Sequence, residues 1–185
     1  SIIANPNCST IQMLIAIAPI HAIAGIDRIN VSTYQSVSGA GSEGLEELAR
    51  QTVDRLSFKD VKPSVFAQPI AFNAIPFIDT MQENDYTREE MKMHWETCKI
   101  LRDESIAVNA TAVRIPVFYG HSEAVHLETK EDIEIDEVRA AMHKAPGLVL
   151  VESIEPSGQV TAVTHAAGKD EVFVSRLRRD HSHSR

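Results

Sequence analysis

The first cysteine of the chain stands where a thiol can react. Cys8 follows the turn Asn5-Pro6-Asn7 and precedes an apolar segment that predicts a helix over 10–24, with Ser9 or Thr10 as its cap. A helix N-terminus favours an anion by about 0.3–1 kcal/mol, and by up to about 2 kcal/mol when partly buried. We therefore expect the pKa of the thiol to be lowered by roughly one unit. The alternative is a packing role, because cysteine is often buried.

A second group of candidate residues lies in the stretch 112–128, which reads AVRIPVFYGHSEAVHLE. Arg114 falls within an apolar β-run, and burying a guanidinium without a partner is expensive, so we expect a paired group or a bound anion. His121 follows Gly120 at a strand break, where a side chain can face a cleft and exchange a proton near neutral pH. The alternatives are an edge-strand arginine with its head in solvent and an ordinary turn histidine.

Three further polar side chains are candidates by their positions. Glu89, Lys92 and Glu96 share one face of a predicted helix by their three- and four-residue spacing. They form either a solvated row of ion pairs or a carboxylate and an ammonium aimed at a small charged substrate. Gln35 is an amide at the end of a predicted strand and carries no specific signal by itself.

The glycines of segment 39–44 match G-x-G-x-x-G between a predicted strand and a predicted helix. We discount a dinucleotide fingerprint, because residues 33–36 are too polar for a central parallel strand. The acidic residue expected about twenty positions later, Asp60, lies in a predicted loop. The segment is interpreted as a flexible turn, with a weaker alternative in which its amides meet a phosphate or cofactor.

Hydrophobic periodicity predicts the elements that must position these groups. Helices are expected over 10–24, 43–56, 87–101 and 135–144, and strands over 2–4, 26–37, 71–77, 108–118, 123–130, 148–152 and 171–178. This order predicts an α+β domain with a mixed, largely antiparallel sheet that helices cover on one face.

Composition narrows the functional class. The 185 residues suit about one domain, and a net charge of −8 argues against binding nucleic acid or an anionic membrane. Two cysteines, Cys8 and Cys98, indicate a reducing compartment, so we expect a cytoplasmic protein. The longest apolar run, 11–18, is too short to span a membrane. The chain opens inside a strand-like run without Met, so we expect a piece of a longer protein.

Four motifs in this order resemble the bacterial aspartate-β-semialdehyde dehydrogenases: NPNCST, STYQSVSGAG, EEMKM with ETCKIL, and RIPVFYGHSEAVHLET. The resemblance runs from Ile2 to about Asp180. It implies that residues 1–185 are the catalytic and dimerisation domain, with the fold of the C-terminal domain of glyceraldehyde-phosphate dehydrogenases. It also implies a homodimer.

The resemblance implies an activity as well. The family makes L-aspartate 4-semialdehyde from L-4-aspartyl phosphate with NADPH, on the pathway to lysine, methionine, threonine and isoleucine. By resemblance, Cys8 is the nucleophile that forms an acyl-thioester, His121 is the acid and base, and Gln35 orients the intermediate.

The remaining roles concern substrate and cofactor. By resemblance, Arg114 holds the substrate carboxylate, Glu89 faces its amino group and Lys92 assists the phosphate. Ser38 and Gly39 approach NADP. The NADP-binding Rossmann domain of the family and its C-terminal helix have no counterpart in this chain, so most of the cofactor site is expected elsewhere. No metal site is expected.

Two alternatives from other classes stay open. One is a non-catalytic oligomerisation module of the same fold, which would have no reason to keep Cys8, Gln35, Arg114 and His121 together. The other is a thiol-redox protein that uses Cys8, which the lack of a nearby resolving cysteine disfavours.

Overall fold

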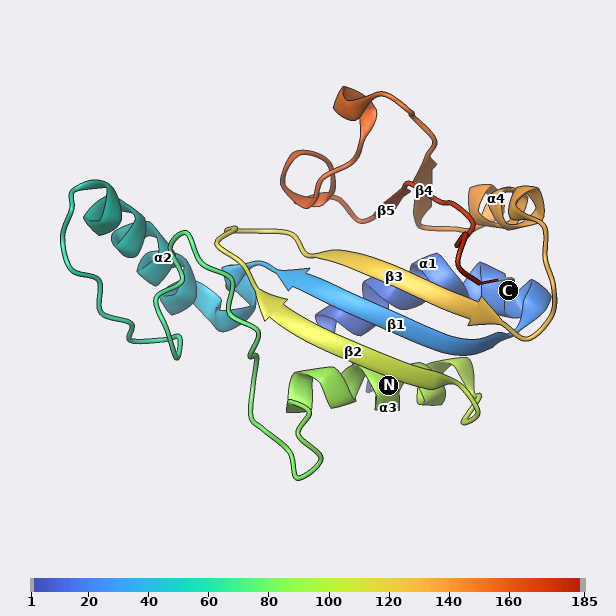
Figure 1. Cartoon of the computed structure of the whole chain (residues 1–185), viewed down its shortest axis with the longest axis horizontal. Helices are drawn as coiled ribbons and strands as arrows, with labels where there is room; N and C mark the ends of the chain where they lie inside the picture. Colours follow the sequence, from blue (N-terminus) through green and yellow to red (C-terminus); the bar gives the residue numbers. More distant parts are fainter. Residues whose placement is uncertain (1, 184–185) are drawn as a thin grey trace.

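The computed structural model describes residues 2–183. Helices and strands alternate irregularly along the chain, and short helical turns (η) join some of them (Figure 1). The elements are α1 (Cys8–Ala24), β1 (Ile26–Gln35), η1 (Val37–Ala40), α2 (Gly41–Leu56), α3 (Arg88–Leu101), β2 (Ala107–Arg114), β3 (Ser122–Thr129), α4 (Ile135–Lys144), β4 (Leu148–Val151), η2 (Pro156–Gly158), η3 (Ala162–Ala166) and β5 (Val172–Ser175).

The main sheet has the strand order β2-β1-β3. β1 pairs in parallel with β2 and antiparallel with β3, while β4 and β5 form a separate parallel pair. The expected mixed sheet is confirmed, but the expectation that it is largely antiparallel is wrong, because two of the three pairings within residues 2–183 are parallel. The long connection through α2 and α3 returns the chain to the end where β1 began, as a parallel crossover requires.

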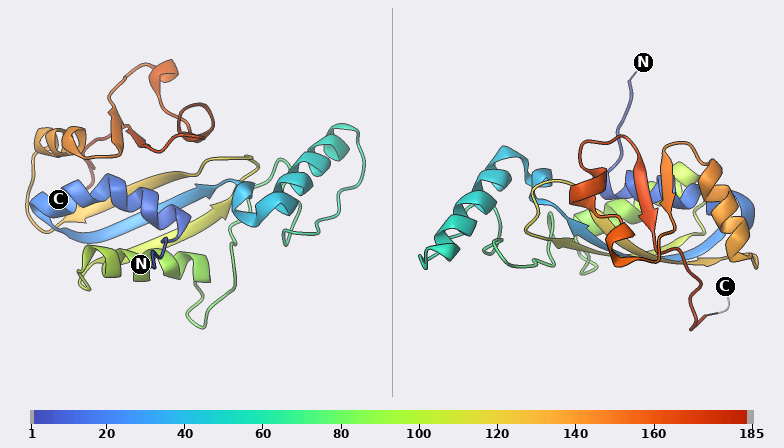
Figure 2. Two further views of the ribbon diagram at one scale, coloured as in Figure 1. Left: turned by 180° about the vertical axis from the view of Figure 1, so that it is seen from behind. Right: turned by 90° about the horizontal axis from the view of Figure 1, so that it is seen from above.

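Helices α1 and α3 cover one face of this sheet (Figure 2, left). α1 buries Met13 and Ile17 against Ile29 of β1, and Met93 of α3 joins the same core cluster. On the other side of α1, Ile20 packs with α4 and β4. Every second residue of β1 from Ile29 to Gln35 is buried, whereas the residues between them are partly or fully exposed. The helices therefore lie on one face, as expected. The opposite face is covered by no helix of residues 2–183, but at one end Asp180 and His183 line a pocket with Asn30 and His126 of that face.

Some expected boundaries are wrong. Residues 2–4 form no strand, and Ile2 and Ile3 are exposed. Within 71–77 only Ile75 makes a β-bridge, because Phe72 turns the chain at a positive φ of 60°. β2 ends at Arg114 rather than at 118, two residues before Pro116, which has no N–H to donate.

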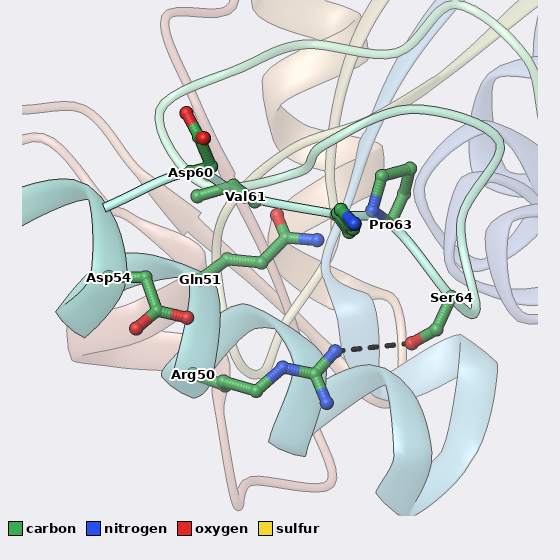
Figure 3. A pocket seen from close by; sticks show the side chains of 8 residues that line it. Arg50, Gln51, Asp54, Asp60, Val61, Pro63 and Ser64 are labelled. Carbon is green, nitrogen blue, oxygen red and sulfur yellow. Dashed lines mark hydrogen bonds between the residues drawn. The ribbon is translucent and has the colours of Figure 1, made fainter. Parts of the chain in front are cut away.

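Helix α2 and the loop after it extend beyond the end of the main sheet (Figure 1). The loop is held by Glu47, which is 1% exposed. Its carboxylate accepts hydrogen bonds from the amides of Ser64 and Val65, from the Ser64 hydroxyl at 2.6 Å and from the Gln51 amide at 2.7 Å. Figure 3 shows Gln51, Arg50 and Asp54 of α2 facing the loop residues across a pocket. The buried carboxylate of Glu47 thus fastens the loop to α2 by hydrogen bonds to the loop backbone, as strand pairing fastens chain segments in the sheets.

Replacing Glu47 with Gln should destabilise α2 and its loop by about 1–3 kcal/mol, because an amide would face the donors that the carboxylate now accepts from. Burial raises the pKa of Glu47, but the hydrogen bonds from Ser64 and Val65 outweigh it, and the net pKa is lowered from 4.5. This contribution to stability is present above about pH 4.5 and is lost as pH falls through the folded-state pKa.

The measurement is urea unfolding followed by helical circular dichroism at pH 7 and at pH 4. Glu46→Gln, an exposed change one residue away on α2, is the matched control. Equal stability of the two variants at pH 7 would contradict the role given to Glu47.

Candidate active site

The chain topology brings the candidate residues to one end of the main sheet. α1 turns back at Gly25 into β1, so the start of α1 lies beside the end of β1. β2 runs parallel to β1 and ends at the same place, and β3 runs antiparallel and begins there. α3 precedes β2 and packs along it, which puts the first turn of α3 at this end too. Residues distant in sequence therefore meet at this end of the sheet.

Cys8 is the first residue of α1 and its side chain is exposed. The cap is Asn7, rather than the expected Ser9 or Thr10. Its side-chain oxygen accepts from the amides of Ser9 at 3.0 Å and Thr10 at 3.1 Å. The cap fixes where the helix starts, and with it the position of the thiol.

The pKa of the Cys8 thiol is raised from 9.0, so the expectation of a lowered pKa is wrong for this chain. The main cause is desolvation by the protein atoms packed around the sulfur, although the side chain reaches solvent. The negative charge of Glu89 adds to the rise, and hydrogen bonds from Ser9 oppose it without cancelling it. In this arrangement the thiol needs a further positive charge before it becomes a good nucleophile.

Glu89 is the side chain on which this arrangement converges. It is 6% exposed, and one of its oxygens, Oε1, accepts from Asn7 Nδ2 at 2.8 Å and from Gln35 Nε2 at 3.2 Å. Its other oxygen, Oε2, lies 3.3 Å from Lys92 Nζ. Glu96, two turns further along α3, accepts from the Asn7 amide at 2.7 Å. The predicted residues of α3 thus hold both the cap of the cysteine helix and the amide of Gln35.

Lys92 lies between two carboxylates. It pairs with Asp79 at 2.9 Å as well as with Glu89, and the hydrogen bond with Asp79 is the main reason that its pKa is raised. Sequence reasoning missed Asp79, because it lies in an irregular loop and has a positive φ of 70°. It also missed Asn7 as a cap. No hydrophobic period marks either residue.

Arg114 ends β2 in register with Gln35 and is 7% exposed. Its Nη1 donates to the Ser36 carbonyl at 2.7 Å. No carboxylate within residues 2–183 lies within 4.0 Å of its guanidinium. Burial lowers its pKa, and the charges of Glu89 and Cys8 oppose this. The solvent-exposed alternative is wrong, and the expected bound anion stays a prediction.

His121 sits between Gly120 and β3, where its ring reaches back to the end of β1. Its Nδ1 lies 3.1 Å from both the amide and the hydroxyl of Ser36. Desolvation lowers its pKa from 6.5, and the charge of Arg114 lowers it further. The ring is therefore neutral at pH 7.

Only residues 39–40 of the glycine-rich segment belong to the turn η1, while residues 41–44 form the first turn of α2, so the interpretation of the whole segment as a turn is wrong. Asp60 lies in a loop, as expected. The amides of Val37 and Ser38 donate to the carbonyls of Val117 and Phe118, so they are not open to a phosphate. Gly39 is exposed, and a Cβ there would lie 3.0 Å from Arg114 Nη1.

Residues 2–183 contain neither a candidate metal site nor a candidate membrane-spanning helix. No group of three or more His, Cys, Asp or Glu side chains is placed to hold a metal ion. No helix in this part combines the length and apolarity needed to cross a membrane.

Glu89→Gln should lower the pKa of Cys8, because it removes the negative charge while keeping an oxygen that can accept from Asn7. The measurement is the rate of iodoacetamide alkylation of Cys8 against pH, followed by peptide mass mapping. The midpoint should move to lower pH, while buried Cys98 stays unlabelled. Glu83→Gln, in the exposed loop before α3, is the control. An unchanged midpoint in Glu89→Gln would show that Glu89 does not set the reactivity of the thiol.

Comparisons with known proteins show the family to which the chain belongs. A family model described as "Semialdehyde dehydrogenase, dimerisation domain" matches residues 17–185. The aspartate-semialdehyde dehydrogenase of Legionella pneumophila is 56% identical over 182 residues, which are 98% of this chain and 52% of that protein. That of Aquifex aeolicus is 50% identical and covers 97% of this chain and 53% of its own length.

Solved structures show the same fold. Aspartate semialdehyde dehydrogenase II from Vibrio cholerae superposes with a TM-score of 0.95 at 53% identity, over 98% of this chain and 53% of that one. Another structure of it, with a TM-score of 0.94, is described as complexed with ASA. The chain spans about half the length of the curated relatives that it matches. The resemblance seen in the four motifs is confirmed, and the chain belongs to the semialdehyde dehydrogenase family, whose dimerisation domain it carries.

Proposed function

We propose that this chain is the catalytic and dimerisation part of an aspartate-semialdehyde dehydrogenase. The whole protein would reduce L-4-aspartyl phosphate to L-aspartate 4-semialdehyde, in the biosynthesis of lysine, methionine, threonine and isoleucine. The observation that carries the proposal is Arg114, a buried guanidinium without a carboxylate partner in the described chain, at the same sheet end as Cys8 and His121. A substrate carboxylate is the group that such a fork holds in two parallel hydrogen bonds.

The chemistry begins at Cys8. Its thiolate would attack the acyl carbon, so that a C–S bond forms and the phosphate leaves with the electron pair of the C–O bond. Glu89 raises the pKa of the thiol in the free chain, and a substrate ammonium group bound to Glu89 would offset that charge. Substrate binding would therefore help to generate the nucleophile that the substrate needs.

The other side chains would hold the reacting groups. Gln35, fixed by Glu89 and Thr33, would orient the acyl oxygen. Lys92 would meet the phosphate when it exchanges Asp79 for that anion. His121, neutral and beside Arg114, would donate a hydrogen bond to the oxygen of the collapsing intermediate.

The turn around Ser38 and Gly39 fits one end of a cofactor. Gly39 is exposed and has no Cβ, so a ligand group can approach the backbone above Arg114 closely. NADPH, when bound, supplies the hydride. The pyrophosphate-binding part of that site is expected outside this chain, because the amides of Val37 and Ser38 already donate to the carbonyls of Val117 and Phe118.

We further propose that two chains pair through the open face of the main sheet, onto which Figure 1 looks. The family description names dimerisation. Tyr34, Thr111 and Ala124 are exposed on this face, on three adjacent strands. Such a face with few charged residues suits a permanent interface better than solvent.

Arg114→Lys, made in a full-length protein that carries this domain, should cost about 2–4 kcal/mol of transition-state stabilisation, because the lysine ammonium cannot form the bidentate pair of hydrogen bonds that the guanidinium forms with a carboxylate. Steady-state kinetics from semialdehyde and phosphate measure the effect. Arg50→Lys on exposed α2 is the matched control.

His121→Asn in the same protein should lower kcat while leaving substrate affinity largely unchanged, since it removes a proton donor rather than a binding group.

Near-normal kcat and KM in Arg114→Lys would remove the carboxylate-binding role and, with it, the observation on which the proposal rests.

Tyr34→Asp should shift the chain from dimer towards monomer in sedimentation at micromolar concentration, because it places a charge on the proposed interface. Ile154→Asp, at a 93% exposed side chain in the loop after β4, should leave the dimer intact. A monomer in the unsubstituted chain would refute pairing through this face.

A further inference from the structure

The ring of His121 contacts a residue to which sequence reasoning gave no role. Ser36 is completely buried between β1 and η1. Its amide donates to His121 Nδ1 at 3.1 Å, and its hydroxyl lies 3.1 Å from the same nitrogen and 2.9 Å from Ser38 Oγ. The amide has no other acceptor in the described chain, so the histidine is what satisfies it.

The backbone around Ser36 is held on both sides. Its carbonyl accepts from Arg114 Nη1 at 2.7 Å. The next two amides, those of Val37 and Ser38, donate to the carbonyls of Val117 and Phe118 at 2.8 and 3.2 Å. The Ser36 N–H therefore cannot rotate away from the ring, unlike the Ser36 hydroxyl, whose hydrogen can turn to either neighbour.

A fixed donor determines the state of the imidazole. A ring nitrogen that accepts a hydrogen bond must carry a lone pair, and the single proton of the neutral ring then lies on the other nitrogen. Protonating Nδ1 would point two N–H groups at each other. The groups around the ring act in both directions, since the charge of Arg114 of β2 disfavours the cation, whereas a backbone hydrogen bond at Gly120 and the charge of Glu89 of α3 favour it. The amide adds a constraint that neither charge supplies, because it distinguishes one nitrogen from the other.

We propose that the backbone amide of Ser36 fixes His121 as the neutral tautomer protonated at Nε2, and that Ser36 is thereby a positioning residue of this site. Resting His121 then presents an N–H group at Nε2, while Nδ1 is engaged by the amide. On the proposed function, on which this consequence rests, this Nε2–H would donate a hydrogen bond to the reacting oxygen of the intermediate.

The test is histidine-ring ¹⁵N spectroscopy of the 185-residue chain, which needs no substrate or cofactor. We expect His121 to show the single Nε2-protonated pattern at pH 7, assigned by its loss in His121→Gln. The Ser36 amide resonance should shift at the pH at which His121 titrates and should be protected from exchange. The seven other histidines serve as internal references.

Two variants separate the amide from the hydroxyl. Ser36→Ala keeps the amide and should keep the single tautomer. Ser36→Pro removes the N–H at a residue whose φ of −65° already suits proline. The Cδ atom of the introduced proline would also displace the imidazole of His121. The His121 titration midpoint should therefore rise, and both tautomers should appear.

An Nδ1-protonated ring or an imidazolium at pH 7 in the unsubstituted chain would overturn the proposal. A Ser36 amide resonance that ignores the His121 titration would overturn it too. These results hold whether or not Ser36→Pro folds. They are also separate from the proposed function, whose failure would appear only in the kinetics.

Discussion

The carboxylate of Glu89 is the interaction on which the site depends. Buried at the start of α3, it joins the cap of the cysteine helix, the amide of Gln35 and the ammonium of Lys92. Without a carboxylate there, Asn7 and Gln35 would each lose an acceptor, and Lys92 would keep only Asp79. The same charge makes the free thiol less acidic. One group therefore holds the site together and, in the free chain, makes its thiol less acidic.

The topology explains why one carboxylate can reach so many partners. Each element that carries a candidate residue starts or ends at the same end of the main sheet, because β1 and β2 run in parallel and α1 and β3 run antiparallel to β1. The Arg114 guanidinium lies there with a backbone carbonyl as its acceptor and no anion. A buried cation is costly to leave unpaired, which is why the proposed function assigns the substrate carboxylate to this position.

The helices of the fold could be predicted from the sequence. Residues 10–24, 43–56, 87–101 and 135–144 have apolar residues in runs or at helical spacing, or capping signals. The start of α1 at Asn7 could not be predicted, because Asn, Ser and Thr all cap helices and spacing does not rank them. Strand direction was missed as well, since the 71 residues between β1 and β2 follow a path that no local sequence pattern predicts. The raised pKa of Cys8 comes mainly from desolvation in the folded chain and then from the charge of Glu89, which lies eighty-one positions away in the sequence.

The central claim is that Cys8 carries an acyl group at a site built for an aspartyl substrate. The most direct measurement mixes a full-length protein carrying this domain with L-aspartate 4-semialdehyde and NADP in the absence of phosphate. The reduced cofactor is followed by absorbance, and the peptides are then mapped by mass spectrometry. The account predicts a burst of about one reduced cofactor per site and an acyl adduct on Cys8, both absent in Cys8→Ser. A steady rate without a burst, or an adduct on Cys98, would contradict it.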